Sequence, residues 1–459
     1  MFLINNIYHH LPIFLQNFAM TCYGYWLKKQ RYGGNFQQYL SEIEKNQWLS
    51  VKDLQEIQER KLQNIIAHSY KNIPYYKNLF DSLCISPQDI KTSSDLKKIP
   101  ILEKQTIKNN KNNFIAQNIS KRELIPYSTG GTTGAPLILY ITKNSLQYNF
   151  ACGEARVKHW AGVKTGDKLA TFLGRVVVAP SVIKPPFWRY NKANNQILFS
   201  SFHLNEKNSD FYIDELNCFQ PKIVQGYVSI IHQFAKYILK LHKKICPPKA
   251  VLVSSETLFD WQKEDIEKAF GARVFNSYSL AEFVAFVSQC EHGGLHISPE
   301  YGIIELEPAG GNNFEIIATT LFNYAMPLIR YKTGDLVTLD ENKSCACGRA
   351  LPLIKSIEGR SDSMLITPEG HSLSPASLSL VFAACPNIHD SQIIQTANDS
   401  ITLKIVKEKQ FNEKDLKNLV DQLKKRLGKV MKIDIEFVQE IARTDAGKRR
   451  LIISKIKPL

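Results

Sequence analysis

Residues 127–137 read Tyr-Ser-Thr-Gly-Gly-Thr-Thr-Gly-Ala-Pro-Leu, and the apolar run 138–141 follows them directly. The nine positions from Ser128 to Pro136 hold three glycines, four hydroxyl residues, one alanine and one proline. Glycine lets backbone N–H groups approach a phosphate closely, and serine and threonine hydroxyls add donors without bulk. The Gly-Lys-Ser/Thr ending of a Walker P-loop is missing. By itself this stretch fits either a phosphate-binding loop or a plain surface turn.

Outward from this loop, strand-like apolar runs alternate with helical stretches, which predicts an α/β sheet with helices on both faces. The predicted strands lie at 137–141, 168–172, 223–225, 250–254 and 272–275. The predicted helices between them lie at 210–219, 229–241 and 261–270. Upstream, the chain reads as mainly helical, with a helix-like apolar spacing over 53–68. Beyond a composition break at 357–362, predicted strands at 401–406 and 432–438 flank an amphipathic helix at 413–427.

These patterns divide the chain of 459 residues into three predicted parts. Residues 1–120 form a mainly helical N-terminal part of a large domain, 121–360 its α/β core, and 361–459 a small α+β C-terminal domain. A chain of this length buries a sizeable core without disulfides. Its nine cysteines are odd in number and scattered, which indicates a reducing compartment, and we expect a cytoplasmic protein.

The chain is basic, with a formal net charge of +15, and its basic residues are spread along it. This charge fits a solvated basic surface or a membrane-proximal one, while the absence of the usual motifs excludes specific nucleic-acid binding. The apolar stretch 1–26 is interrupted by polar residues and is too broken to span a bilayer. It reads either as a packed amphipathic element or as an interfacial helix giving peripheral association with the inner membrane.

Four further segments follow the glycine-rich loop along the chain. They are Asn-Ser-Tyr-Ser-Leu-Ala-Glu at 276–282, Arg-Tyr-Lys-Thr-Gly-Asp at 330–335, Glu-Gly-Arg-Ser-Asp-Ser-Met at 358–364 and Arg-Thr-Asp-Ala-Gly-Lys at 443–448. In this order the motifs resemble those of the adenylate-forming acyl ligases, most closely the phenylacetate–CoA ligase-like branch. That branch includes proteins encoded with capsular polysaccharide biosynthesis genes. The resemblance covers roughly residues 60–459.

The resemblance implies an ATP-dependent ligase that converts a small carboxylic acid to an acyl-adenylate and releases pyrophosphate. It implies Lys448, Glu282 and Thr133 as catalytic residues, with Glu282 near Mg²⁺. Both reactants are anions, so the site must supply positive charge and orientation. The residues it implies for nucleotide binding are Ser128, Thr129, Gly130, Gly131, Thr132, Thr133, Gly134, Ser255, Glu256, Tyr278, Ser279, Glu282, Asp335, Arg360 and Lys448.

Individual roles follow from the same resemblance. Tyr278 is expected to stack on adenine, and Asp335 to accept hydrogen bonds from the ribose hydroxyls. Arg360 and Asp362 correspond to a hinge about which a mobile C-terminal domain carries Lys448 into the site. The chain departs from the family pattern where Ser279 replaces a common glycine, where serines precede Glu256 in the adenine-pocket segment, and where Ser363 replaces an aspartate.

A second constellation combines the C-x-C pair Cys345 and Cys347 with Cys290, His292 and His296. Three thiolates and an imidazole suit tetrahedral Zn²⁺, and free buried thiols are the alternative. Resemblance to zinc-binding members of the branch favours Cys290, His296, Cys345 and Cys347 as ligands, with His292 in reserve. Four protein ligands close a zinc site, so the predicted role is structural.

Two functional hypotheses differ in the molecule that accepts the acyl group. One is transfer to CoA, and the other is transfer to an amine or hydroxyl in capsule or surface polysaccharide biosynthesis. A third hypothesis, a non-catalytic nucleotide-binding scaffold, is disfavoured by the joint presence of Glu282, Asp335 and Lys448. The sequence does not identify the acid substrate. The candidate pocket residues, Tyr227, Phe172 and the aromatic stretch 187–190, fit either an acid pocket or the core.

Overall fold

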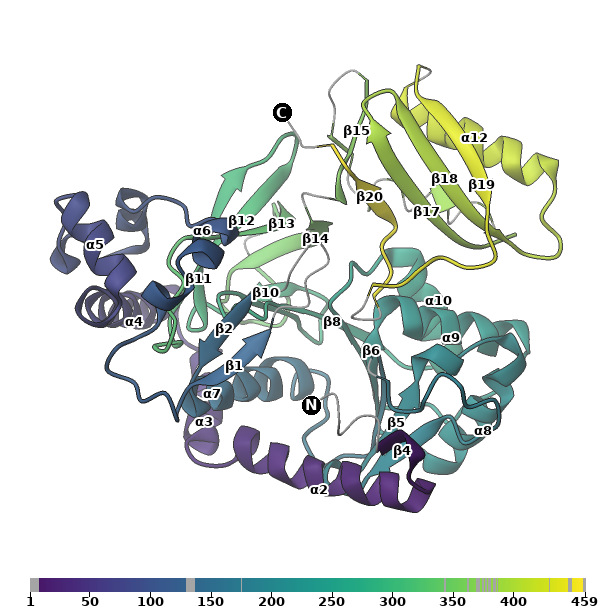
Figure 1. Ribbon diagram of the computed structural model, residues 1–459, viewed down its shortest axis with the longest axis horizontal. Coiled ribbons are helices and arrows are strands. Elements are labelled where there is room, and N and C mark those ends of the chain that lie inside the picture. The colour runs from purple at the N-terminus through teal and green to yellow at the C-terminus, as the bar shows by residue number, and fades with distance from the viewer. Residues whose placement is uncertain are drawn as a thin grey trace.

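The computed structural model is an α/β protein with a large N-terminal domain and a smaller C-terminal domain, as the sequence predicts (Figure 1). It describes residues 8–128, 137–174, 176–341, 344–360, 363–368, 372–373, 375, 378, 381–382, 385, 387–428, 430–444 and 448–456.

One mixed sheet of twelve strands dominates the described part of the large domain, in the order β11-β12-β13-β14-β10-β9-β8-β7-β6-β3-β5-β4. The strands from β5 through β3, β6 and β7 to β8 run parallel to one another. Their carboxyl ends therefore meet at one edge of the sheet, the usual place for a ligand in such folds. In chain order the strands are β3 (Leu169–Leu173), β4 (Trp188–Asn191), β5 (Gln196–Ser200), β6 (Ile223–Tyr227), β7 (Ala250–Ser254), β8 (Val274–Ser279), β9 (Phe286–Gln289), β10 (Leu295–Ile297), β11 (Gly302–Pro308), β12 (Asn313–Thr320), β13 (Tyr331–Leu339) and β14 (Leu353–Arg360).

Helices cover both faces of this sheet. On one face, α9 (Val228–Lys240) packs on β3, β6 and β7, between α8 (Ser209–Phe219) and α10 (Asp260–Phe270). Elsewhere, α2 (Ile13–Tyr32) lies along the edge strand β4, and α3 (Phe36–Asn46) packs against α7 (Lys143–Cys152). Figure 1 shows α4 (Val51–Asn72), α5 (Pro74–Ser82) and α6 (Lys104–Asn109) grouped at the β11–β12 end of the sheet.

Local sequence explains several element boundaries. Four of the five β7 residues are buried, as expected for an apolar strand covered on both faces. The helix α4 begins after Ser50, whose side chain accepts a hydrogen bond from the Asp53 N–H, and Pro74 opens α5. The strand β8 continues past the predicted end at residue 275 to Ser279, because its polar residues pair with β9.

The C-terminal domain is a four-stranded sheet, in the order β19-β18-β17-β20, covered by α12 (Glu413–Leu427). Its strands are β17 (Ile388–Ala397), β18 (Ser400–Lys407), β19 (Lys432–Phe437) and β20 (Ile452–Ser454), and a short pair, β15 (Leu365–Ile366) and β16 (Ser372–Leu373), precedes them. Leu419, Leu423 and Leu427 bury the inner face of α12. A capping box between Asn412 and Asp415 fixes its first turn, and its bounds equal the predicted ones.

The glycine-rich loop connects β1 (Ile125–Ser128) to β2 (Ile138–Ile141), which pair antiparallel with Ser128 opposite Ile138. The predicted phosphate-binding residues Thr129, Gly130, Gly131, Thr132, Thr133 and Gly134 lie outside the described residues. Ser128 is exposed at the end of β1, where the loop leaves the hairpin.

Candidate active site and metal centre

A cavity of about 630 Å³ lies at the carboxyl edge of the parallel strands, between the two domains. Residues that follow or end β7 and β8 line it, together with side chains from β13, β14 and the C-terminal domain. The predicted nucleotide-binding residues among its lining are Ser255, Glu256, Tyr278, Ser279, Asp335, Arg360 and Lys448. The fold thus brings seven predicted residues from separate segments into one cavity.

The predicted ribose-binding carboxylate is buried and partly paired. The Tyr278 hydroxyl donates a hydrogen bond of 2.8 Å to Asp335 Oδ2, and Arg360 Nη1 lies 3.9 Å from Asp335 Oδ1. Asp335 and Arg360 are cross-strand neighbours in β13 and β14, which places both side chains on the cavity wall. Burial and the carboxylate of Asp335 raise the pKa of Tyr278 well above its ordinary value, so its hydroxyl remains a donor.

Glu282, predicted to lie near Mg²⁺, is buried in the segment between β8 and β9. Burial raises the pKa of its carboxyl above the ordinary value, and the Asp335 carboxylate adds to this shift. The Tyr331 hydroxyl donates a hydrogen bond of 3.3 Å to its Oε1. A buried carboxylate of this kind gains a strong partner when a dication binds, so the residue type fits the predicted role.

Glu256 connects the large domain to the C-terminal domain. Its Oε2 accepts a hydrogen bond of 2.7 Å from the Ser229 N–H at the start of α9. Its Oε1 accepts one of 2.9 Å from the Arg449 N–H, next to the predicted catalytic lysine. The preceding Ser255 adopts a left-handed φ of 71°, a strained conformation that collects at functional sites. Ser279, by contrast, does not have a positive φ, so the glycine common in the family is not required there.

Lys448 enters the cavity from the C-terminal domain. Its Nζ lies 5.6 Å from the centre of the Tyr227 ring, and its backbone N–H donates to Thr444 Oγ1 at 3.2 Å. Burial lowers the pKa of the Lys448 amine, and the carboxylates of Glu256 and Asp335 partly oppose this effect. The chain thus presents an ammonium group to the same space as Asp335 and Glu256.

Helix α9 provides the docking surface for the C-terminal domain. Arg443 Nη2 donates to Gln233 Oε1 at 2.9 Å, and Lys236 Nζ donates to the His389 carbonyl at 3.1 Å. One turn further on, Lys240 Nζ lies 3.3 Å from Glu408 Oε2. Residues spaced by three and four positions lie on one side of a helix, so these contacts form a single stripe.

Some predicted residues are not placed in this cavity. Asp362 of the hinge and residues 445–447 of the lysine loop lie outside the described residues. Phe172 and Phe187 were candidates for either an acid pocket or the core. Both are fully buried in the core beneath α8 and α9, so they are core residues. Tyr227 remains a candidate, because its ring faces the Lys448 amine.

The four favoured metal ligands come from the end of β9, from β10 and from the segment between β13 and β14, and they lie together. One ligand atom from each of Cys290, His296, Cys345 and Cys347 falls within 4.8 Å of the others. Cys290 Sγ and Cys345 Sγ are 3.6 Å apart, and Cys347 Sγ is 3.4 Å from His296 Nε2. Around a tetrahedral Zn²⁺ these separations are about 3.8 Å and about 3.6 Å. The donor set and its spacing therefore fit zinc.

The protonation chemistry of the cluster also suits a cation. Burial raises the pKa of the Cys290 thiol to about 12. Burial lowers the pKa of His296, so its imidazole is neutral, and His296 Nδ1 lies 3.2 Å from the Leu351 carbonyl, which fixes the ring. A dication would hold the buried thiols as thiolates. His292, the reserve ligand, offers only its backbone N–H to Cys290 Sγ, at 3.4 Å.

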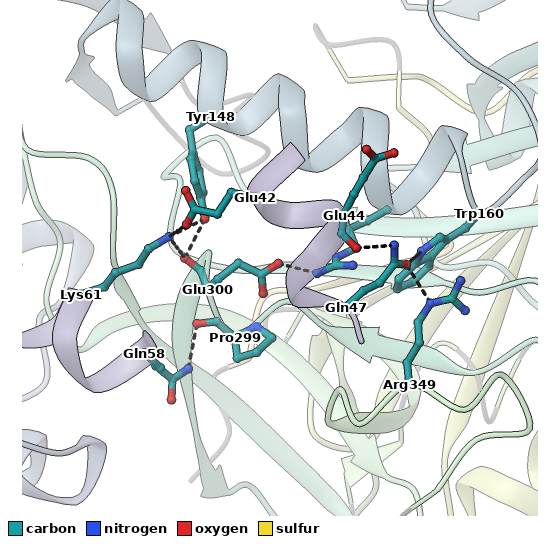
Figure 2. Close-up of polar contacts among 11 residues, drawn as sticks. Glu42, Glu44, Gln47, Gln58, Lys61, Tyr148, Trp160, Pro299, Glu300 and Arg349 are labelled. Carbon is teal, nitrogen blue, oxygen red and sulfur yellow. Dashed lines mark hydrogen bonds and ion pairs between the residues drawn. The ribbon is translucent and has the colours of Figure 1, made fainter. Parts of the chain in front are cut away.

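Arg349, two positions after Cys347, contacts the N-terminal helices, and Figure 2 shows its side chain beside Gln47 and Trp160. Its Nε donates to Gln47 Oε1 at 2.9 Å, and the Trp160 indole N–H donates to the same oxygen at 2.8 Å. Its guanidinium also lies 4.6 Å from the centre of the Trp160 ring, and it forms an ion pair with Glu291. Trp160 in turn packs edge-on against His296.

Comparison with known proteins agrees with this geometry. Over 458 residues the chain is 31% identical to Protein CapK of Staphylococcus aureus, covering 99% of this chain and 100% of that protein. A family model described as the CapK C-terminal domain matches residues 365–455. The chain belongs to the CapK family. Phenylacetate-coenzyme A ligase of Thermus thermophilus is 24% identical over 88% of this chain and 97% of its own. The family is therefore one of adenylate-forming ligases.

Solved structures give the same fold for this CapK-family chain. A 2-hydroxyisobutyryl-CoA ligase in the postadenylation state superposes with a TM-score of 0.69 at 18% identity, covering 89% of this chain and 91% of that one. The same ligase in the thioesterification state gives a TM-score of 0.56 at 19% identity over the same shares. The adenylate-forming architecture predicted from the motifs is thus confirmed.

Sequence reasoning missed several residues of the candidate site and of the surface where the two domains meet. Arg449 follows Lys448 directly and contacts Glu256, and this adjacency to a predicted catalytic lysine was an available signal. Gln233 and Lys236 carried no such signal, because their partners lie more than 150 positions away in the chain. The contact between Gln47 and Arg349, which are 302 positions apart, could not be predicted from the sequence either.

Proposed function

We propose that this chain uses ATP to convert a small carboxylic acid to an acyl-adenylate and then transfers the acyl group to an acceptor. The observation that carries the proposal is the convergence of Glu256, Tyr278, Asp335, Arg360 and Lys448 on one interdomain cavity. Four segments of the large domain and one of the C-terminal domain supply these side chains. A cation beside buried carboxylates at the ends of parallel strands is the arrangement that a nucleotide ester needs.

In the first step a carboxylate oxygen attacks the α-phosphorus of ATP, and the bond from that phosphorus to pyrophosphate breaks. Lys448 lies where its ammonium group can offset the negative charge that builds up on the α-phosphate. Asp335 would accept hydrogen bonds from the ribose hydroxyls, and Tyr278 would pack on the adenine. Mg²⁺, when bound, neutralises the phosphates, and Glu282 is the residue proposed to hold it. Thr133 and its neighbours from Ser128 to Gly134 are proposed to donate to the outer phosphates.

The domain arrangement supports a conformation suited to this first step. The match to the postadenylation state of 2-hydroxyisobutyryl-CoA ligase exceeds the match to its thioesterification state, with TM-scores of 0.69 and 0.56. Lys448 faces the cavity in the present arrangement. We propose that rotation about the segment containing Asp362 withdraws this lysine and opens the cavity to the acyl acceptor, so domain 361–459 acts as a mobile unit.

Pyrophosphate exchange into ATP, measured across a panel of carboxylic acids, tests adenylation directly. Lys448→Ala should lower acid-dependent exchange by at least about a hundredfold, because a charge acting in the transition state is lost. ATP binding, followed by calorimetry, should change far less. The matched control is Lys432→Ala, which removes an exposed lysine of the same domain. Absence of exchange with every acid, in protein shown to bind ATP, refutes the proposal.

The acceptor is proposed to be CoA, with an amine or hydroxyl acceptor in capsule or surface polysaccharide biosynthesis as the second candidate. CoA is favoured by the phenylacetate-CoA ligases among the relatives. The second candidate is favoured by the higher identity to Protein CapK, over 100% of that protein. Mass spectrometry of products formed from ATP and an activated acid, with CoA or with amino and hydroxy compounds, separates them. A thioester supports the first, and an amide or ester supports the second.

We further propose that Cys290, His296, Cys345 and Cys347 hold a structural Zn²⁺. The 3.6 Å and 3.4 Å separations between ligand atoms support this assignment, as does the buried, neutral imidazole. All four positions around the metal would be filled by the protein, so the site would stabilise the fold and take no part in the reaction. Metal analysis of protein purified without chelator tests it, with one zinc per chain expected.

A further inference from the structure

The helix α2 is oriented with its polar side inward. Its buried residues are Gln16 and Gly24, whereas Phe14 is 69% exposed, Phe18 66% and Trp26 55%. Surface helices normally bury the apolar side and leave the polar side in water. Figure 1 shows α2 along the outer edge of the molecule beside β4, and its main contacts among the described elements are with β4, the 192–194 turn and α7.

Seven of the nine exposed residues of α2 form one continuous stripe, and Ile13 and Tyr23 lie outside it. At 100° per residue, Phe14, Tyr25, Phe18, Cys22, Leu15 and Trp26 fall within an arc of about 120°. All six are exposed. Lys29 shares the arc at its C-terminal end and is also exposed. We call these seven residues the α2 surface. A stripe of aromatic side chains with a single charge at one end is not what an ordinary water-facing helix displays.

Polar contacts on the inward side fix the rotation of this helix. Arg189 Nε donates to Gln16 Oε1 at 2.6 Å, and the Tyr190 N–H donates to Asn17 Oδ1 at 2.9 Å. A Cβ added at Gly24 would lie 2.2 Å from Asn191 Oδ1, so the helix backbone presses directly on β4. Turning the aromatic stripe inward would break these contacts. The outward position of the α2 surface is therefore built into the fold.

The charge carried by α2 itself is entirely of one sign. The first 41 residues contain no aspartate or glutamate, and Lys28, Lys29 and Arg31 occupy the last turns of the helix. Lys192, at the β4–β5 turn beside α2, is exposed and adds to this end. Apolar and aromatic side chains beside basic ones match the interface of an anionic bilayer, where tyrosine and tryptophan sit at headgroup depth.

We propose that the α2 surface is a membrane-docking face that inserts its aromatic side chains into the headgroup region of an anionic lipid bilayer. The helix lies in the plane of the interface, with Phe14, Leu15 and Phe18 in the acyl boundary. Tyr25 and Trp26 lie at headgroup depth, and Lys29 contacts lipid phosphate. A second copy of this chain on the same face is the competing occupant, but it would place like charges together without an acidic partner on α2.

Binding to vesicles of phosphatidylglycerol and phosphatidylcholine, compared with phosphatidylcholine alone, tests the proposal with the full-length protein. The partition coefficient should be higher on the anionic vesicles and should fall with added salt. Phe14→Ser/Phe18→Ser should lower it by at least about tenfold, and Lys29→Gln by about fivefold on anionic vesicles only. The control, Phe202→Ser/Phe437→Ser, removes two exposed aromatic side chains from other surfaces and should bind like the wild type.

Tryptophan fluorescence gives a second readout. Trp26 is the one tryptophan of the five on the α2 surface, so brominated lipid should quench wild-type emission. Trp26→Phe should remove the quenching while retaining most of the binding. Absence of binding to anionic vesicles overturns the proposal, as does an equal loss in the control variant. A dimer in light scattering that Phe14→Ser/Phe18→Ser dissociates, without vesicle binding by the wild type, assigns the face to a second copy instead.

Discussion

Substituting Lys236 by methionine should slow adenylation without slowing transfer from a preformed adenylate. Lys236 Nζ donates to the His389 carbonyl at 3.1 Å, across the interface that holds the C-terminal domain in the position proposed for adenylation. A hydrogen bond from a charged donor contributes about 1.5–3 kcal/mol when partly buried. Losing the lower amount would reduce the ratio of closed to open molecules by about tenfold. Methionine retains the volume of the side chain.

Two half-reactions measured separately provide the assay. Acid-dependent pyrophosphate exchange reports the first step, and product formation from a synthetic acyl-adenylate reports the second. We expect kcat/KM for exchange to fall by about tenfold, with the second step unchanged or faster, because only the first requires Lys448 in the cavity. The matched control is Lys243→Met, just beyond the end of α9, whose ion pair with Asp210 stays within the large domain. Equal losses in both steps would refute the proposed role of Lys236 in holding the C-terminal domain against α9.

Three further predictions concern the metal, the lysine and the core. Cys345→Ser should abolish zinc retention and lower the melting temperature, whereas Cys218→Ser, at an exposed cysteine, should change neither. Because burial lowers the pKa of Lys448 below the ordinary lysine value of 10.5, the amine loses its charge, and exchange activity should decline, at a pH below 10.5. The residual activity of Lys448→Arg should lack this decline, because arginine keeps its charge. Arg156→Met, which leaves Glu300 unpaired and fully buried, should lower the free energy of unfolding in urea by about 3–5 kcal/mol.

Local patterns explain which features the sequence could predict. The helix α12 matches its predicted bounds because three leucines at helical spacing and a capping box act within fifteen residues. Each half of the metal constellation is also local, since Cys345 and Cys347 are two positions apart and Cys290 and His296 are six apart. The combination of the two pairs into one ligand set came instead from the resemblance to zinc-binding relatives, because spacing does not show that the pairs meet.

Contacts between distant segments explain what could not be predicted. The hydrogen bond from Arg349 to Gln47 joins residues 302 positions apart, and no local pattern marks either partner (Figure 2). The orientation of α2, with its aromatic side chains outward, also depends on a contact between distant segments, the hydrogen bond from Arg189 to Gln16. The sequence left a packed and an interfacial helix as alternatives for this segment. Which side faces solvent was decided by the polar residues of β4.

The α2 surface and the domain-docking surface of α9 lie on different parts of the large domain. The first follows the edge strand β4, while the second lies over β3, β6 and β7 next to the C-terminal domain (Figure 1). A bilayer bound at α2 would therefore not block the rotation proposed for the C-terminal domain. Adenylation, which uses soluble ATP and a small acid, gains nothing from such a bilayer. An acceptor hydroxyl or amine carried on a lipid would gain a large local concentration from it. Vesicle-dependent acceleration confined to the second step would thus favour a membrane-borne acceptor over CoA, and equal rates with and without vesicles would favour CoA.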